Sequence, residues 1–250
     1  MAIYIHLSIL RINLFLCVTL SGSAAGAVRT CRTDAPPAVA RVWPALGTMM
    51  SAAGWGPDSI RVAHALEAAY DSVDRVDSLM QRHAAIRAID SMRSEIRRRT
   101  GITLRADSLA SGYALDRAML GLGRDVDSVL LDLGGQYSWF GPPGRGTHRA
   151  VGVPDPDNTL RTLAVVDLQG GSVRTQSQRN APHGAARSVT VLADDGLTAH
   201  AWAAAFLALG CDRALRIAQQ GMHALCADST GVRWATGLQN RVSLPAARAP

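Results

Sequence analysis

The sequence contains no lysine: all 26 basic residues among its 250 residues are arginine. This absence excludes a Schiff-base lysine, a P-loop lysine and a lysine general base, and with them PLP enzymes and P-loop nucleoside triphosphatases. Aromatic residues are also few, at 5%, whereas hydrophobic residues make up 48% and are sufficient for a substantial core. The composition therefore predicts a globular protein and excludes a disordered or fibrous chain.

The sequence also lacks a hydrophobic run of the roughly 18 to 20 residues needed to cross a bilayer, so no transmembrane segment is expected. A shorter apolar run, Ile12 to Leu20, follows Arg11 and precedes Ala25-Gly26-Ala27. This order is typical of a secretory signal peptide with an Ala-x-Ala cleavage site. We therefore predict that residues 1–27 are a signal peptide and that the protein is exported to the periplasm or the cell surface.

Cysteine is scarce, with four residues in the chain. Cys17 lies within the predicted signal peptide, and lipidation there is an alternative to soluble export. Cys31, Cys211 and Cys226 would remain in the mature protein. An oxidising compartment permits a Cys211–Cys226 disulfide, but spacing alone does not decide the pairing.

No segment carries a concentrated charge, although the formal net charge is +6. The single basic run, Arg97 to Arg99, has no interleaved aromatic residues, so it predicts a solvated helix end and no nucleic-acid partner. Asp71, Asp74 and Asp77 recur at intervals of three residues, which we interpret as the solvated face of a helix. No His, Cys or carboxylate pair has the spacing of a zinc site.

The periodicity of apolar residues predicts one domain that mixes helices and strands. Residues 28–44 hold three prolines and no periodicity, so we expect a linker before a domain over 45–250. Helices are predicted over residues 58–80, 84–99, 113–122, 198–209 and 213–220. Strands are predicted over 46–52, 128–133, 149–153, 163–168 and 188–193, with one or two more within 231–242. The predicted fold class is α+β.

Six segments carry a family resemblance when they are taken in order. They are Leu46-Gly47-Thr48, Ala65 to Asp74, Arg105 to Asp116, Val129 to Gly135, Val151 to Pro156, and Ser188 to Val191 followed by Ala199 to Gly210. Together they resemble the motifs of the FAD:protein FMN transferase (ApbE) family. The resemblance is strong over Ser111-Gly112-Tyr113-Ala114-Leu115-Asp116, where the family has Lys-Gly-Tyr-Ala-x-Asp.

The resemblance implies a single ApbE-like α+β domain with a mixed or antiparallel sheet and packed helices. It implies an exported, Mg²⁺-dependent enzyme that transfers FMN from FAD to a Thr or Ser hydroxyl of a flavin-acceptor protein. The positions implied to contact the flavin nucleotide are Leu46, Gly47, Thr48, Arg105, Asp107, Ser111, Gly134 and Gly135. The positions implied at the metal site are Ser108, through its backbone carbonyl, His200 and Ala204. No catalytic side chain is assigned.

The sequence differs from the family pattern at several of these positions. The family has Asp and Thr as magnesium ligands where this chain has His200 and Ala204, and neither replacement offers the oxygen ligand that Mg²⁺ prefers. The family's flavin-contacting Asp is Arg105 here, with Asp107 two residues further on as a candidate substitute. The family's Lys is Ser111, in keeping with the absence of lysine.

Two segments that help enclose the flavin in the family have no counterpart here, one between residues 80 and 105 and the other between residues 179 and 188. The sequence therefore predicts a shortened flavin pocket. The alternative to an active transferase is a non-catalytic exported descendant that binds flavin weakly or serves as an interaction module.

Overall fold

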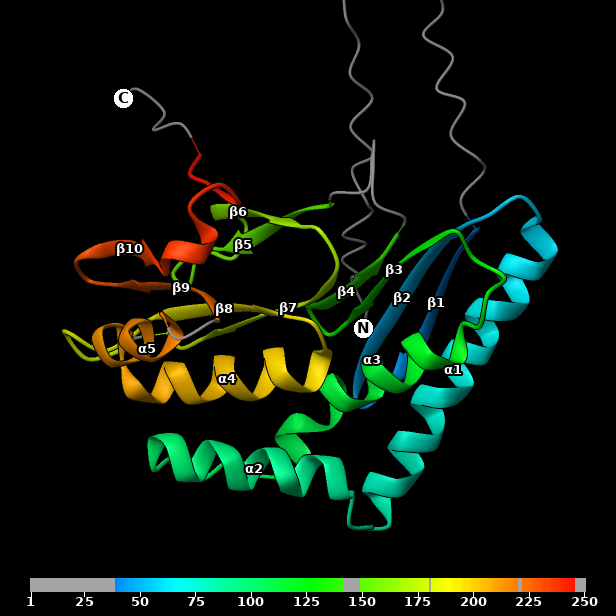
Figure 1. Ribbon diagram of the computed structural model, residues 1–250, viewed down its shortest axis with the longest axis horizontal. Helices are drawn as coiled ribbons and strands as arrows, with labels where there is room; N and C mark the ends of the chain where they lie inside the picture. Colours follow the sequence, from blue (N-terminus) through cyan, green and yellow to red (C-terminus); the bar gives the residue numbers. More distant parts are fainter. Residues whose placement is uncertain (1–38, 142–148, 180, 220–221, 246–250) are drawn as a thin grey trace, which may run out of the picture. The chain divides into compact units, whose positions relative to one another are not determined.

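A computed structural model describes residues 39–141, 149–179, 181–219 and 222–245, all within one compact unit spanning Pro36–Pro250 (Figure 1). The predicted signal peptide, Cys17 and Cys31 lie outside the described residues. The described part is an α+β domain in which antiparallel sheets are covered by helices, as the sequence predicts.

The main sheet has eight strands in the order β1-β2-β3-β4-β7-β8-β9-β10, and every neighbouring pair is antiparallel. Its strands are β1 (Val39–Ala45), β2 (Thr48–Trp55), β3 (Ser128–Leu133), β4 (Gln136–Phe140), β7 (Gly171–Ser177), β8 (Ser188–Ala193), β9 (His223–Asp228) and β10 (Gly231–Trp234). A second sheet has the order β11-β6-β5, with β5 (Arg149–Pro154), β6 (Thr162–Leu168) and β11 (Val242–Ser243).

The second sheet packs on one face of the main sheet through an apolar layer, and helices cover the opposite face (Figure 1). Five α-helices are present in the described residues: α1 (Ser59–Gln81), α2 (Arg87–Thr100), α3 (Ala110–Gly121), α4 (Gly196–Leu209) and α5 (Cys211–Ala218). Short 3₁₀ turns are η1 (Asp107–Leu109) and η2 (Thr236–Leu238). None of these helices is both long enough and apolar enough to span a membrane.

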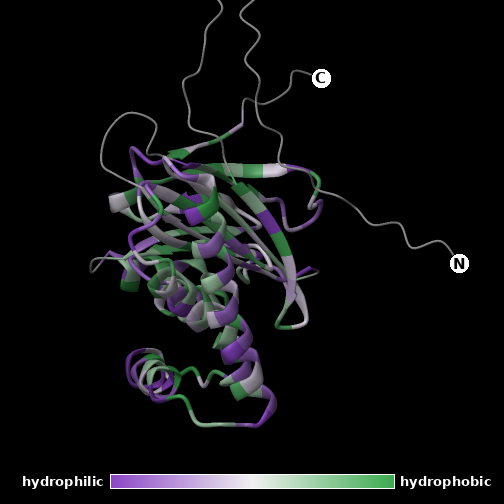
Figure 2. Cartoon of the chain, turned by 90° about the vertical axis from the view of Figure 1, so that its right-hand side faces the viewer, coloured by the Kyte–Doolittle hydropathy of each residue, from purple (hydrophilic) through white to green (hydrophobic). Residues whose placement is uncertain are grey.

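Helices α1 and α3 share a core with β2 and β3, whereas α4 and α5 share a second core with β8 and β9. Helix α2 adds its buried Ile89 and Ile96 to the second core and presents mainly hydrophilic residues elsewhere (Figure 2). Arg97 and Arg98 are exposed at its end, as predicted, while the Arg99 guanidinium lies 4.6 Å from the ring centroid of Trp202. In this arrangement, α4 is the helix that packs across the middle of the main sheet.

The structure corrects the sequence prediction in two places. The expected linker over 28–44 includes most of β1, which is the edge strand, so the strand predicted over 46–52 is instead the second strand, β2. The strands β4, β7 and β9 were not predicted. In β7 the reason is physical: its one large apolar residue is Val173, so the segment lacks the apolar alternation of a half-buried strand. Strand β4 does alternate, with Tyr137 and Trp139 next to polar residues, but it is only five residues long.

Helices α3 and α4 cross at two glycines. A Cβ atom on Gly112 would lie 2.5 Å from the Gly196 carbonyl oxygen, and one on Gly196 would lie 2.6 Å from the Gly112 carbonyl oxygen. Both distances are shorter than van der Waals contact allows, so only glycine at both positions permits this approach. The crossing therefore fixes how deeply the start of α3 sits beside α4.

The Asp116 carboxylate joins the same two helices. It accepts hydrogen bonds from the backbone N–H groups of Gly196, at 2.5 Å, and Leu197, at 3.0 Å, so a side chain of α3 satisfies the free donors at the start of α4. Burial raises the pKa of Asp116 to about 6, against the effect of these two donors. The strongest part of the family motif, residues 111–116, thus encodes this helix junction.

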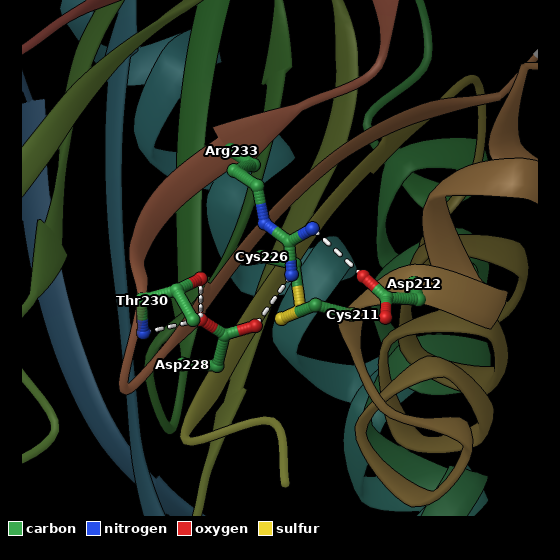
Figure 3. A network of polar contacts seen from close by, with 6 residues as sticks. All are labelled: Cys211, Asp212, Cys226, Asp228, Thr230 and Arg233. Carbon is green, nitrogen blue, oxygen red and sulfur yellow. Dashed lines mark hydrogen bonds and ion pairs between the residues drawn. A yellow bond between two sulfur atoms is a disulfide. The ribbon is translucent and has the colours of Figure 1, made fainter. Parts of the chain in front are cut away.

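A disulfide links Cys211, at the start of α5, to Cys226 of β9 (Figure 3). Arg233 of β10 lies beside it and bridges Asp212 of α5 and Asp228 of β9. The covalent and ionic links both attach α5 to the end of the sheet.

Replacement of Cys211 and Cys226 by serine should lower the free energy of unfolding by about 3 kcal/mol, because the bond closes a loop with a sequence separation of 15 residues. Chemical denaturation with and without reductant measures this difference. A reductant should destabilise the wild type alone. Equal sensitivity of both proteins would contradict the disulfide.

The substitution Gly112→Ala should destabilise the protein by about 1–3 kcal/mol, because the new methyl group forces α3 away from the Gly196 carbonyl. Gly152→Ala is the matched control, since its methyl group would lie 3.6 Å from Thr162 in ordinary contact. Denaturation midpoints measure both variants. A Gly112→Ala protein as stable as the control would show that the two helices are not held at this distance.

Candidate functional site

Two hairpin turns lie side by side at one end of the sheet. Leu46-Gly47 connects β1 to β2 with φ angles of 49° and 73°, and Gly134-Gly135 connects β3 to β4 with 59° and 78°. Two consecutive left-handed residues are typical of a tight type I′ hairpin turn. The Thr48 methyl carbon lies 3.0 Å from the position of a Cβ on Gly134, and Gly134 N–H donates to the Met49 carbonyl at 3.3 Å. Both glycine motifs therefore shape the backbone at this edge.

Polar side chains of β4 and β7 form a strip beneath α4. The register pairs Gln136 with Arg174 and Ser138 with Ser172, and Gln176 follows two residues further along the same face of β7. Gln136, Ser138 and Ser172 are buried. Polar groups buried in this way need hydrogen-bond partners, and α4 supplies two of them, the Gly196 carbonyl and His200.

The hydrogen bonds of His200 determine its tautomer. Gln136 Nε2 donates to the Gly196 carbonyl at 2.7 Å, so the oxygen of that amide faces His200 Nδ1, at 3.0 Å. A carbonyl oxygen only accepts, and Nδ1 therefore carries the proton. Nε2 is then the acceptor for Gln176 Nε2, at 2.9 Å. Ser111 Oγ lies 3.0 Å from Nδ1. Both ring nitrogens are thus occupied by neighbouring side chains.

His200 is a neutral imidazole. Burial lowers its pKa to about 3, and the nearby Arg174 guanidinium acts in the same direction. The side chain is 4% exposed, so water cannot compensate a charge on the ring. His200 therefore positions Ser111, Gln136 and Gln176 and carries no charge at neutral pH.

Arg174 is the cation nearest to this network. Its Nη1 donates to the Gly134 carbonyl at 2.9 Å, which ties the guanidinium to the β3–β4 turn. Its Nε is buried and has no hydrogen-bond partner among the described residues. Burial lowers the pKa of Arg174, and Asp132 opposes that effect, but a guanidinium stays protonated in proteins. A fixed positive charge therefore lies beside His200.

A cavity of about 410 Å³ lies between the two turns, the start of α3 and α4, and Ser111, Arg174 and His200 are part of its lining. Seven of the positions predicted from the family resemblance line it: Leu46, Thr48, Asp107, Ser108, Ser111, Gly134 and His200. The lining also includes Arg174 and Gln176, which the sequence analysis missed. No period-two signal marked these two residues, because Thr175 and Ser177 on the other face of β7 are polar as well.

The remaining predicted positions lie around the cavity without lining it. Gly47 completes the β1–β2 turn, and Gly135 lines a separate cavity with Tyr137 of β4. Ala204 lies one turn beyond His200 on α4 and packs against the apolar core. Arg105 is exposed at the mouth, where its guanidinium forms two hydrogen bonds with Asp107, at 2.6 and 3.0 Å. This pairing lowers the pKa of Asp107 and raises that of Arg105.

A second, more apolar groove of about 520 Å³ begins at the same ion pair. It runs between the end of α1 and the start of α2, past Met80, Ile86 and Ile89, and it shares Asp107 with the polar cavity. The groove lies in the part of the chain where one enclosing segment of the family has no counterpart. Together the two hollows offer a polar chamber and an adjoining apolar surface.

The residues present do not fit a Mg²⁺ ion. Both nitrogens of His200 are engaged, and Ala204 offers no ligand atom and does not line the cavity. No group of three or more His, Cys, Asp or Glu side chains that could hold a metal ion exists within the described residues. The Arg174 guanidinium would also repel a divalent cation beside His200. Of the predicted ligand set, only Ser108 remains.

The neutral state of His200 predicts a pH dependence of stability. Its pKa is about 3 in the fold and about 6.5 when unfolded, so the folded state binds fewer protons between these values and stability falls as pH falls through this window. From about pH 6.5 to about pH 5 the loss should be about 2 kcal/mol. Urea denaturation of wild type and His200→Gln isolates this contribution. Identical slopes in the two proteins would contradict a buried neutral His200.

Comparisons with known proteins agree with this fold. The sequence profile of the ApbE family matches residues 37–226. The ApbE protein of Thermotoga maritima has 16% identity and a TM-score of 0.62, with 82% of this chain and 99% of that chain covered. The flavin transferase ApbE of Vibrio cholerae has 14% identity and a TM-score of 0.61, with 82% and 100% covered.

The flavinyl transferase ApbE of Pseudomonas stutzeri, in its apo form, has 15% identity and a TM-score of 0.62, with 84% of this chain and 99% of that chain covered. No curated protein sequence matches the chain. At these identities the solved structures establish the fold, and the profile covers most of the chain. The resemblance predicted from the six motifs is confirmed: the chain belongs to the ApbE family.

Proposed function

We propose that the protein is a flavin transferase that binds FAD in the cavity between the two turns and α4 and transfers FMN to a hydroxyl of a partner protein. Membership of the ApbE family supports this proposal, as do the names of the similar proteins from Vibrio cholerae and Pseudomonas stutzeri. The observation that carries it is the cavity itself. Its lining brings together seven positions, from Leu46 to His200, that the family resemblance assigns to FAD or its metal.

The two adjoining hollows suit the two kinds of surface that FAD presents. A polar chamber of about 410 Å³ matches its hydroxyl and phosphate groups, and the groove beside Met80, Ile86 and Ile89 matches an aromatic ring. Neither hollow encloses a dinucleotide alone. The proposal therefore places the ligand across Asp107, which both hollows share.

The reaction is a substitution at phosphorus. The acceptor hydroxyl oxygen forms a bond to the FMN phosphorus, the bond from that phosphorus to the AMP oxygen breaks, AMP leaves, and the hydroxyl proton passes to solvent. His200 is not the base, because its ring nitrogens are engaged and its pKa is about 3. The chain positions the phosphates and excludes competing geometries. Such positioning dominates the catalysis of substitution at phosphorus.

The proposal contains no step through Mg²⁺, since the residues at His200 and Ala204 do not fit the ion. A second candidate function follows from the same observation: a protein that binds flavin without transferring it. The unmatched enclosing segments and the engaged His200 favour this alternative.

Export to the periplasm or the cell surface is part of the proposal. The predicted signal peptide supports it, and the pairing of Cys211 with Cys226 suits an oxidising compartment. The acceptor would then be an exported protein that presents an accessible Thr or Ser hydroxyl.

The two candidate functions differ in one product. Incubation of the purified protein with FAD and a Thr-bearing flavin-acceptor domain should release AMP, seen by chromatography, and add the mass of FMN to the acceptor. The acceptor with its Thr replaced by Ala is the control and should gain no mass. FAD binding without AMP release would favour the non-catalytic function. Absence of both FAD binding and AMP release would overturn both candidate functions.

A further inference from the structure

The cavity has an unusual charge balance for a site that receives phosphates. Asp107 is neutralised by its bidentate pairing with Arg105 at the mouth. His200 is neutral, and Gln176 and Ser111 are uncharged. Among the described residues of the lining, this leaves the Arg174 guanidinium as the one charge without an ion-pair partner.

Arg174 makes one side-chain hydrogen bond within the described residues, and most of its donors make none. A single hydrogen bond, from Nη1 to the Gly134 carbonyl, orients the guanidinium toward the turn at the cavity edge. Its second Nη1 hydrogen and both Nη2 hydrogens make no hydrogen bond within the described residues. A planar guanidinium with two free N–H directions matches two phosphate oxygens, and such charge-assisted bonds are the strong ones.

Within the described residues, no neighbour of Arg174 forms an ion pair with its guanidinium. The guanidinium interacts electrostatically with position 200, so a carboxylate there, as the family pattern has, would offset its charge. A neutral imidazole with both nitrogens engaged adds no such opposite charge. Asp132 interacts with Arg174 electrostatically but forms no ion pair with it within the described residues, and its carboxylate accepts the Gly135 N–H at 2.9 Å.

We propose that Arg174 takes the place of the divalent cation: its guanidinium binds the phosphate groups of the flavin nucleotide, and the site works without a metal ion. This proposal rests on the proposed function for the identity of the ligand. A purely structural role, in which Arg174 only holds the Gly134 turn, is the alternative.

The test compares phosphate-bearing and phosphate-free flavins in the presence of EDTA. FAD and FMN should bind the full chain with affinities that Mg²⁺ leaves unchanged, whereas riboflavin, which has no phosphate, should bind at least about tenfold more weakly. Fluorescence titration gives all three affinities. Inorganic pyrophosphate should displace FAD under the same conditions.

The variant Arg174→Gln should lose at least about tenfold in FAD affinity and leave riboflavin affinity unchanged. Arg161→Gln is the matched control, because Arg161 is exposed and outside the lining of the cavity. His200→Asp should also weaken FAD binding in EDTA, since the new carboxylate would pair with Arg174. Arg174→Lys keeps the charge and should retain part of the affinity if Arg174→Gln does not fold.

The outcomes separate the two proposals. FAD binding that requires Mg²⁺, or that is equal in wild type and Arg174→Gln, would overturn the role of Arg174 while leaving flavin binding intact. A wild type that binds none of the three flavins, with or without Mg²⁺, would overturn the proposed function instead. Equal binding of riboflavin and FAD, with no competition by pyrophosphate, would show that the phosphates are not recognised.

Discussion

The contact between Gly112 and Gly196 is the constraint on which the site depends. Because neither residue has a side chain, α3 and α4 approach until each glycine's carbonyl oxygen lies only 2.5 or 2.6 Å from where the other's Cβ would be. The Asp116 carboxylate then reaches the first N–H groups of α4 and fixes its axial position. Ser111, one residue before the contact, and His200, one turn after it, consequently face each other at hydrogen-bonding distance. A greater distance between α3 and α4 would disrupt the hydrogen-bond network beneath α4.

The sequence was sufficient for most elements whose burial is apolar, although the apolar strand β9 was not predicted. Strands β3 and β8 have the predicted bounds, because segments rich in Val and Leu end at clear turn residues. Strand β7 could not be found in the same way, since its positions facing α4 hold Ser172, Arg174 and Gln176 instead of apolar residues. What hides this strand from a periodicity argument is the polar strip beneath α4. One strand of the cavity lining was therefore not predictable from apolar periodicity.

The candidate site shows a similar division. The resemblance to the family located most of the cavity lining, because motif residues that build turns and a helix crossing keep their chemistry even when ligands change. Spacing along the chain could not indicate the tautomer of His200, which depends on Gly196 orienting the Gln136 amide from another element. Nor could it place Arg174 beside His200, since β7 and α4 meet only in the folded sheet. The sequence motifs were enough to locate most of the cavity lining. The charges of the side chains in the cavity could be assigned only from the structure.

The difference from the family pattern at His200 bears on Arg174, because the guanidinium and the imidazole interact electrostatically. An aspartate at position 200 and a free guanidinium at position 174 would neutralise each other, leaving neither a metal ligand nor a phosphate-binding cation. If the carboxylate were replaced and no protein cation were present, the phosphate groups would face only uncharged side chains. Here a neutral imidazole, hydrogen-bonded to two glutamines, adds no negative charge beside the guanidinium, which has no ion-pair partner within the described residues. On this view His200 is not a failed metal ligand: it is the neutral neighbour that a guanidinium-based phosphate site requires.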